Sequence, residues 1–207
     1  SIALLKRFSE ILPLRVIEES RNLSFSCSNN RAAREARGDF LLFLNNDIIF
    51  CSDILPALMA GADKTGEELL GVRLHYPSLK GKEVGTGDVQ HDGIRFKIDT
   101  KFEFYRPYNL QPQTESSSVE TLAPAATAAA LLCSAKRFAR LGGFDEQYDY
   151  GYEDVDLCLR HLTQGGNAIH ISRVGHVVHD EGSTQRHDDR DKETIRRKKN
   201  INVLWRR

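Results

Sequence analysis

Residues 40–47 read FLLFLNND, an unbroken run of five apolar residues followed by two amides and a carboxylate. The apolar residues do not alternate with polar ones, so both faces of the strand that they predict should be buried, as in a parallel sheet. The stretch therefore predicts a core strand of an α/β fold, with three polar side chains at its carboxyl end.

The segments around this strand alternate in type. The predicted elements nearest to it are helices over residues 1–11, 29–38 and 52–63 and a short strand over residues 14–19. Gly38 is placed to end the second helix, and Ser52 or Asp53 is the expected N-cap of the third. This β-α-β-α order predicts a layered α/β fold with right-handed crossovers and a mixed, mainly parallel sheet flanked by helices.

From residue 71 onward the pattern changes. Strand-like segments separated by Gly, Lys and Pro predict antiparallel strands or hairpins up to residue 108. The later predicted elements are a strand of small residues before residue 134, helices over residues 134–142 and 153–165, a strand over residues 167–172 and a basic helix over residues 191–207. The sequence has no internal repeat, so we expect a single domain.

The composition excludes several classes of protein. Of 207 residues, 40% are apolar and 28% charged, which is enough to bury a core. Lys plus Arg and Asp plus Glu number 29 each, so the chain has no net positive charge that would favour binding to nucleic acid. No apolar run approaches the ~18 residues that span a bilayer. The four cysteines include no C-x-x-C pair, which argues against a disulfide framework and favours a reducing, cytoplasmic compartment.

Asn45, Asn46 and Asp47 have two interpretations. They can form a capped turn after the strand, because Asn and Asp side chains bond their own backbone in such turns. They can also hold a ligand, since open α/β sheets bind ligands beyond the carboxyl ends of their strands. A carboxylate there can reach a divalent cation that bridges the phosphates of a nucleotide.

A second cluster lies over residues 144–156, where six acidic residues are interleaved with aromatic ones. Glu153 and Asp154 fall at the start of a predicted helix, where free N–H groups and the helix dipole stabilise a carboxylate. Capping explains one acid, whereas an aromatic-rich loop carrying several acids is suited to a carbohydrate. One of these carboxylates is then a candidate general base.

Two further segments carry polar groups. His176, His179, Asp180 and His187 lie within twelve residues near a predicted strand end, at a spacing that matches no standard zinc motif. The basic tail over residues 196–207 has a short apolar stripe that favours packing on the domain, with contact to an anionic membrane surface as the alternative.

Together, four stretches resemble the inverting GT-A glycosyltransferases of family 2, especially their bacterial rhamnosyltransferase-like branch. They are NLSFSCSNNRAAREARGDFLLFLNNDI from residue 22, ATAAALLCSAKRFARLGGFDE from residue 126, YGYEDVDLCLR from residue 150 and HVVHDEGST from residue 176. The first is similar to the N-N block and the D-x-D-type motif of that family, and the third to its E-D motif. Their common order makes the resemblance more specific than any single stretch.

The resemblance implies a GT-A fold and a role for each matching residue. Asp47 would bind Mn²⁺ or Mg²⁺ at the donor diphosphate, with His179 as the second metal ligand. Asn45 and Asn46 would lie near the donor sugar or ribose, and Asn30, from the N-N block, would also contact the donor. Asp154 would be the general base that deprotonates the acceptor hydroxyl, and Glu153 would orient it or contact the acceptor.

The implied partners are a UDP- or dTDP-sugar and a glycan or lipid-linked saccharide. The charge balance predicts no nucleic-acid partner, and the expected location is the cytoplasm, with peripheral contact at the cytoplasmic face of the membrane as the alternative use of the basic tail. The expected layout is a donor side over residues 1–70, variable strands and a loop over residues 71–120, a catalytic side over residues 121–193 and the basic helix over residues 194–207. The two strands with which the family begins are missing, so we expect a further segment before Ser1.

Two other functions are compatible with the sequence. A non-catalytic carbohydrate-binding or scaffold module, derived from such a transferase, would explain the missing nucleotide strands. A metal-dependent hydrolase or phosphoesterase would use the His and Asp cluster, but that class usually has several ligands at tight spacing.

Overall fold

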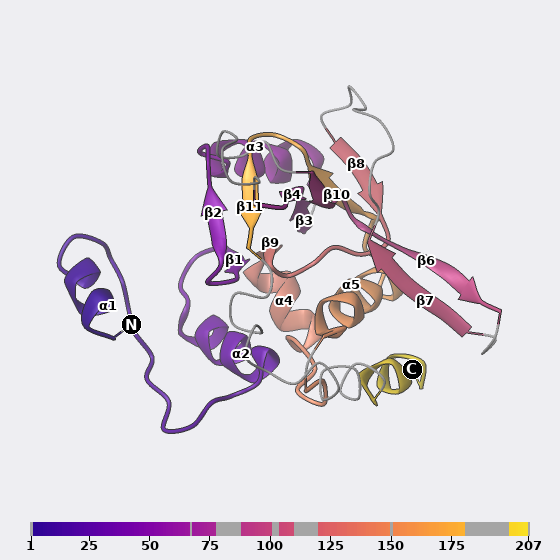
Figure 1. Cartoon of the computed structure of the whole chain (residues 1–207), viewed down its shortest axis with the longest axis horizontal. Coiled ribbons are helices and arrows are strands. Elements are labelled where there is room, and N and C mark those ends of the chain that lie inside the picture. Colours follow the sequence, from indigo (N-terminus) through magenta and orange to yellow (C-terminus); the bar gives the residue numbers. More distant parts are fainter. Residues whose placement is uncertain are drawn as a thin grey trace.

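The computed structural model describes residues 2–66, 68–77, 88–100, 104–109, 120–149, 151–180 and 199–206. Within them the strands form three sheets (Figure 1). The first has five strands in the order β1 (Phe40–Leu44), β9 (Ala130–Ser134), β3 (Leu69–Val72), β10 (Ile169–Ser172) and β8 (Glu120–Ala123). The second has the order β2 (Ile48–Phe50), β11 (Val177–His179), β4 (Leu74–His75) and β5 (Val89–His91). The third pairs β6 (Ile94–Asp99) with β7 (Phe104–Asn109), a hairpin that projects from the body.

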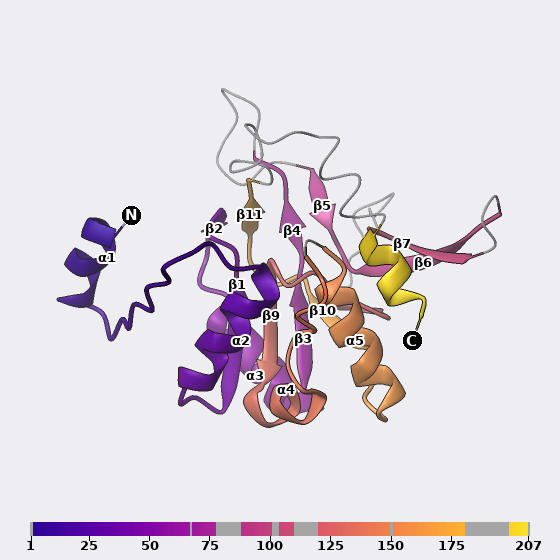
Figure 2. The same cartoon turned by 90° about the horizontal axis from the view of Figure 1, so that it is seen from below.

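Five helices are assigned in the described residues. They are α1 (Ile2–Ser9), α2 (Phe25–Glu35), α3 (Leu55–Thr65), α4 (Ala135–Leu141) and α5 (Glu153–Thr163). A further helical stretch over residues 199–204 belongs to the predicted basic helix, whose earlier part lies outside the described residues. Figure 2 shows α1 standing apart from the sheets, and none of its residues is buried.

The prediction that 40–44 is a core strand is confirmed. Leu41 and Phe43 of β1 point into one apolar cluster together with α4 and α5. Phe40 and Leu42 pack against a second cluster that contains Leu58 of α3. The five-stranded sheet is therefore covered on both faces, with α3 on one side and α2, α4 and α5 on the other (Figure 1).

The mixed sheet flanked by helices is also confirmed, but the expectation of mainly parallel pairing is wrong within the described residues. In the five-stranded sheet only β10 and β3 pair in parallel, while β9 lies antiparallel between β1 and β3, and β8 lies antiparallel to β10. In the four-stranded sheet β11 pairs in parallel with β4, and its pairing with β2 and that of β4 with β5 are antiparallel. An unbroken apolar run indicates that both faces of a strand are buried. The direction of that strand relative to its neighbours depends on which strands it pairs with.

Helix α4 begins and ends at capping residues, whereas α2 does not end at the predicted Gly38. Ser134 Oγ accepts a hydrogen bond from the Arg137 N–H at the start of α4, and Gly142 ends that helix at a φ of 81°. The helix predicted over 29–38 starts earlier, at Phe25, because Ser24 Oγ accepts from the Cys27 N–H and forms an N-cap. Its C-cap is Ala36, two residues before Gly38.

The strand predicted over residues 14–19 is wrong. The segment has no regular secondary structure, and Leu14 and Val16 are exposed. A strand needs a hydrogen-bonded neighbour, and none pairs with this segment among the described residues.

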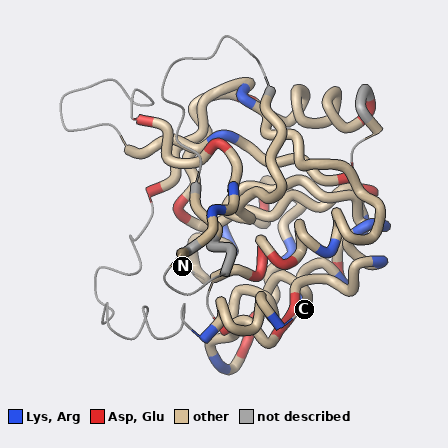
Figure 3. The backbone as a smooth tube through the Cα atoms, turned by 90° about the vertical axis from the view of Figure 1, so that its right-hand side faces the viewer, with Lys and Arg blue, Asp and Glu red and all other residues tan. Residues whose placement is uncertain are grey.

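Basic and acidic residues are interspersed along the described backbone (Figure 3). Within the same residues, no helix has the length and apolar character needed to cross a bilayer.

Candidate functional site

Three of the predicted site residues meet where β1 and β11 end. Asn45 follows β1, Asp47 lies in the turn before β2, and His179 is the last residue of β11. The antiparallel pairing of β11 with β2 places His179 opposite Ile48 and so beside Asp47. The His179 Nε2 atom lies 3.2 Å from Asp47 Oδ1 and 3.3 Å from Asn45 Nδ2.

The His179–Asp47 pair is buried and polar. The side chains are 9% and 15% exposed, respectively. His179 Nδ1 lies 2.8 Å from Gln90 Oε1, which can only accept a hydrogen bond, so Nδ1 carries the ring proton in the neutral imidazole and Nε2 presents a lone pair. Within the described part of the chain, Asp47 Oδ1 has no hydrogen-bond donor. When His179 is neutral, two acceptor atoms therefore face each other, an arrangement that a cation would stabilise.

The pair fits a divalent cation that is shared with a substrate. Two ligands bound to one octahedral ion at about 2.1 Å lie roughly 3 Å apart, which matches the separation of the two side-chain atoms. No group of three or more His, Cys, Asp and Glu residues that could hold a metal occurs among the described residues. The described residues therefore offer two ligands here, and Mg²⁺-type sites often combine one or two protein ligands with substrate phosphates.

Asp154 lies at the start of α5, after a backbone turn at Tyr152 with a φ of 72°. Its Oδ1 accepts a hydrogen bond from the Val155 N–H at 2.8 Å, and its Oδ2 accepts one from the Ala128 N–H at 3.1 Å. The residue keeps some exposed surface, but its carboxyl group lies deep enough that burial raises the pKa of Asp154, against the effect of these hydrogen bonds. A carboxylate of this kind is a stronger base than an exposed one.

The backbone before β9 joins the two groups. Ala128 donates its N–H to Asp154, and the carbonyl oxygen of Ala129 accepts a hydrogen bond from the Asn45 N–H at 3.0 Å. Asp154 and Asn45 are therefore attached to neighbouring residues of one segment. The structure brings together Asn45, Asp47 and His179 by direct contact, and Asp154 through this backbone.

Asn46 and Glu153 lie next to these residues in the chain. Asn46 is exposed in the turn between β1 and β2. Glu153 is buried at the first position of α5.

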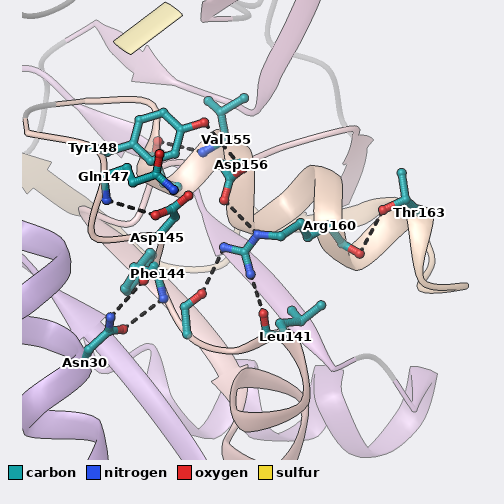
Figure 4. A network of polar contacts seen from close by, with 12 residues as sticks. Asn30, Leu141, Phe144, Asp145, Gln147, Tyr148, Val155, Asp156, Arg160 and Thr163 are labelled. Carbon is teal, nitrogen blue, oxygen red and sulfur yellow. Dashed lines mark hydrogen bonds and ion pairs between the residues drawn. The ribbon is translucent and has the colours of Figure 1, made fainter. Parts of the chain in front are cut away.

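Asn30 lies elsewhere, in α2 (Figure 4). Its Nδ2 donates to the Phe144 carbonyl oxygen and to Glu146 Oε1, at 2.8 and 3.0 Å, and its Oδ1 accepts from the Phe144 N–H at 2.9 Å. These contacts tie α2 to the loop after α4. These hydrogen bonds give the Asn30 side chain a structural role, and none of them places it beside the His179–Asp47 pair.

The side chains of the other described residues of the His-rich segment are not seen to join the His179–Asp47 pair. The ring of His176 stacks on that of His75, with centroids 3.9 Å apart. The Asp180 N–H donates to the carbonyl oxygen of Asp47 at 3.0 Å, so this residue contributes through its backbone. His187 lies outside the described residues.

Sequence reasoning missed Gln90, His91 and Thr127. Gln90 contacts His179, and His91 Nε2 accepts a hydrogen bond from the Thr127 N–H at 3.3 Å, next to the residue that holds Asp154. A neutral Gln and a His in a short strand carry no spacing signal. The one available sign was a run of polar residues, Gln90 to Asp92, in a segment predicted to be a strand.

Comparison with curated proteins gives bacterial relatives. The chain is 26% identical over 201 residues to the uncharacterized protein y4gI of Sinorhizobium fredii, which covers 94% of this chain and 21% of that protein. It is 29% identical to the O-antigen biosynthesis protein RfbC of Myxococcus xanthus, over 80% of this chain and 13% of that one. It is 27% identical to the rhamnosyltransferase WbbL of Escherichia coli, over 70% of this chain and 54% of that one. The chain thus spans only part of the length of these relatives.

Solved structures show the same fold. GalNAc-T7, crystallised with UDP, GalNAc and Mn²⁺, superimposes with a TM-score of 0.63 at 16% identity, over 86% of this chain and 35% of that one. Staphylococcus aureus TarS, residues 1–349 in complex with UDP, superimposes with a TM-score of 0.56 at 15% identity, over 86% of this chain and 46% of that one. The fold is therefore GT-A.

A sequence profile supplies the family. The profile described as "Glycosyl transferase family 2" matches residues 1–120, which is more than half of the chain and includes β1 and the Asn45–Asp47 turn. This chain therefore belongs to glycosyl transferase family 2.

Proposed function

We propose that this chain carries the site of a metal-dependent, inverting glycosyltransferase. The donor would be a UDP- or dTDP-sugar, the acceptor a hydroxyl of a saccharide or lipid-linked glycan, and the cation Mn²⁺ or Mg²⁺. The observation that carries the proposal is the contact of 3.2 Å between His179 Nε2 and Asp47 Oδ1, at the end of the core strand β1. Two of the structural neighbours were crystallised with UDP, one of them also with Mn²⁺.

Asp47 and His179 would hold the cation. The Asp47 carboxylate contributes an anionic oxygen, and the Nε2 lone pair of His179 contributes a neutral nitrogen from the next strand. Asn45 and Asn46, one half-buried and one exposed, would contact the donor sugar or ribose. When bound, the cation would neutralise the negative charge on the departing diphosphate.

Asp154 would accept the proton of the acceptor hydroxyl. Inversion requires one base on the face of the sugar opposite the leaving group. Asp154 suits this role because it lies on a different element from Asp47: it is hydrogen-bonded to Ala128, before β9, whereas Asp47 lies in the turn between β1 and β2. Burial raises the pKa of Asp154, which makes its carboxylate a stronger base. Glu153, buried beside it, would orient Asp154 or contact the acceptor.

In the proposed layout of the domain, residues 1–70 would form the donor side and residues 121–193 the catalytic side. The four cysteines are free, which is compatible with the cytoplasm as the site of action.

Calorimetry tests the metal half of the proposal. We expect Mn²⁺-dependent binding of UDP or dTDP, and we expect it to be lost in Asp47→Ala because one of the two proposed ligands is removed. Asp63→Ala, an exposed site in α3, is the matched control and should bind like the wild type. Absence of binding by the wild type, or equal affinity in Asp47→Ala, would show that Asp47 does not bridge to a diphosphate.

A further inference from the structure

Gln90 contacts His179 through both ends of its amide. It lies in β5 and is 3% exposed. Its Oε1 lies 2.8 Å from His179 Nδ1, and its Nε2 donates to the His179 carbonyl oxygen at 3.3 Å. One buried side chain thus holds both the ring and the backbone of the proposed metal ligand.

These contacts determine which ring nitrogen carries the proton. The His179 carbonyl oxygen can only accept, so the NH₂ group of Gln90 must face it and the amide oxygen must face Nδ1. Nδ1 is therefore the donor. Asn45 agrees with this assignment, because its Nδ2 can only donate and lies 3.3 Å from Nε2.

The strand that carries Gln90, β5, is held in place by hydrogen bonds of the two residues that follow Gln90. Asp92 follows β5, is fully buried and accepts hydrogen bonds from both Arg73 and Arg173. Successive side chains of a strand point to opposite faces, so His91 turns the other way and holds the N–H of Thr127. Gln90 is thus presented to His179 from a rigid support.

We propose that Gln90 is a positioning residue of the transfer site. It fixes neutral His179 as the Nδ1–H tautomer and directs the Nε2 lone pair toward Asp47. The purpose of this arrangement rests on the proposed function, whereas the tautomer is a property of the protein without any ligand. A hydrogen bond of this kind to the second ring nitrogen orients a metal-binding His and raises its basicity.

Nitrogen-15 NMR of the histidine side chains reads the tautomer directly. Spectra would be recorded without metal at about pH 8, where an ordinary imidazole is neutral, and His179 would be assigned by comparison with His179→Asn. We expect a protonated Nδ1 and an unprotonated Nε2 in the wild type. A wild-type spectrum with the proton on Nε2 would overturn the proposal.

Two variants separate the acceptor from the rest of the side chain. Gln90→Leu removes the acceptor and should lose the preference for Nδ1–H, whereas Gln90→Glu keeps an oxygen acceptor and should retain it. Gln164→Leu is the matched control, because Gln164 is exposed after α5 and contacts Arg137 only through its carbonyl oxygen. Thermal melts establish that each variant is folded. If Gln90→Leu does not fold, the wild-type and Gln90→Glu spectra still decide.

Mn²⁺ titration in the presence of UDP gives a second readout. Affinity should fall about 10- to 100-fold in Gln90→Leu and stay near the wild-type value in Gln90→Glu and Gln164→Leu. An unchanged tautomer in folded Gln90→Leu would overturn the proposal. If the wild type shows the predicted tautomer but binds neither Mn²⁺ nor UDP, the proposed function fails while the role of Gln90 in fixing the tautomer stands.

Discussion

The surroundings of Asp154 favour its proposed role in proton transfer. Burial disfavours its ionised form, while backbone N–H groups of Ala128 and Val155 favour it, and the net effect raises the pKa of Asp154 above its ordinary value of 3.8. The same two hydrogen bonds hold the carboxylate in one orientation. The residue therefore combines a fixed position with increased basicity.

Replacing this carboxylate tests its role as the base. Asp154→Asn should lower kcat about 10²-fold or more, because the amide cannot accept the proton of the acceptor hydroxyl. Mn²⁺ and UDP binding, measured by calorimetry on the same variant, should be retained since Asp47 and His179 are unchanged. Turnover would be measured on the longest soluble form of the protein, and normal kcat in Asp154→Asn would refute the assignment.

The raised pKa also predicts a pH dependence. Only ionised Asp154 can act as a base, so kcat/KM should fall as the pH is lowered through the pKa of Asp154, at a pH above the ordinary 3.8 of an aspartate. A pH profile of kcat/KM measures this directly. A profile that stays flat down to about pH 4, the range of an unperturbed Asp, would show that another group limits the reaction.

At this scale, the sequence singles out the carboxylates and the imidazole of the candidate site more readily than the amide of Gln90. Asp47, Asp154 and His179 stand out because carboxylates and imidazoles at strand and helix ends have chemical uses, and the resemblance assigns them roles. Gln90 depends on contact with His179, 89 positions away in sequence, which no local pattern encodes. Asn30 belongs to a matching block, yet its amide is bonded to Phe144 and Glu146.

At the scale of elements, α5 is held to the loop after α4 by one guanidinium (Figure 4). Arg160 donates to Asp156 Oδ2 at 2.7 Å, to the Leu141 carbonyl oxygen at 2.6 Å and to the Gly143 carbonyl oxygen at 2.9 Å. The carbonyl groups at the end of α4 would otherwise be left without these donors. Since α5 begins with Glu153 and Asp154, this contact also fixes the helix that carries the proposed base.

Removing that guanidinium should destabilise the fold. Arg160→Met should lower the free energy of unfolding by about 3–5 kcal/mol, because Asp156, with a side chain only 3% exposed, loses its charged partner. Arg15→Met is the matched control, since the Arg15–Glu35 pair is exposed and should contribute about 1 kcal/mol or less. Urea denaturation of both variants gives the comparison, and equal losses would contradict the importance of the buried contact.

The elements that the sequence predicts well are those with their own local signals. The core strand β1 has its apolar run, α4 has Ser134 and Gly142 at its ends, and α5 has an apolar face that is buried. The strand expected over residues 14–19 has no partner among the described residues and is therefore not a strand. Strand direction was also mispredicted, because the position of β9 between β1 and β3 depends on long-range pairing.

At the scale of the whole molecule, one buried carboxylate connects the two larger sheets. Asp92 follows β5 of the four-stranded sheet, while Arg73 follows β3 and Arg173 follows β10 of the five-stranded sheet. Each arginine donates to both oxygens of Asp92. This triad joins the sheet that carries His179 to the sheet that carries the end of β1, so it supports both halves of the proposed site.

Breaking the triad should destabilise the molecule as a unit. Asp92→Ala leaves two largely buried guanidinium groups without their shared carboxylate and should lower the free energy of unfolding by about 3–5 kcal/mol. Asp63→Ala, exposed in α3, should change it by no more than about 0.5 kcal/mol. Urea denaturation followed by tryptophan fluorescence and by circular dichroism measures both values. A loss in Asp92→Ala no greater than that of the control would contradict a role in joining the sheets.

The triad also predicts how stability depends on pH. Burial opposes ionisation of Asp92, but the hydrogen bonds from Arg173 and Arg73 outweigh it and lower the pKa of Asp92 below its ordinary 3.8. A group whose pKa is lower in the folded state stabilises that state above its unfolded pKa. The contribution of Asp92 should therefore be complete above about pH 4 and be lost as the pH falls further, through the lowered pKa. In acid titrations of stability, Asp92→Ala should lack this part of the loss, and a wild-type and variant that lose stability in parallel would contradict the prediction.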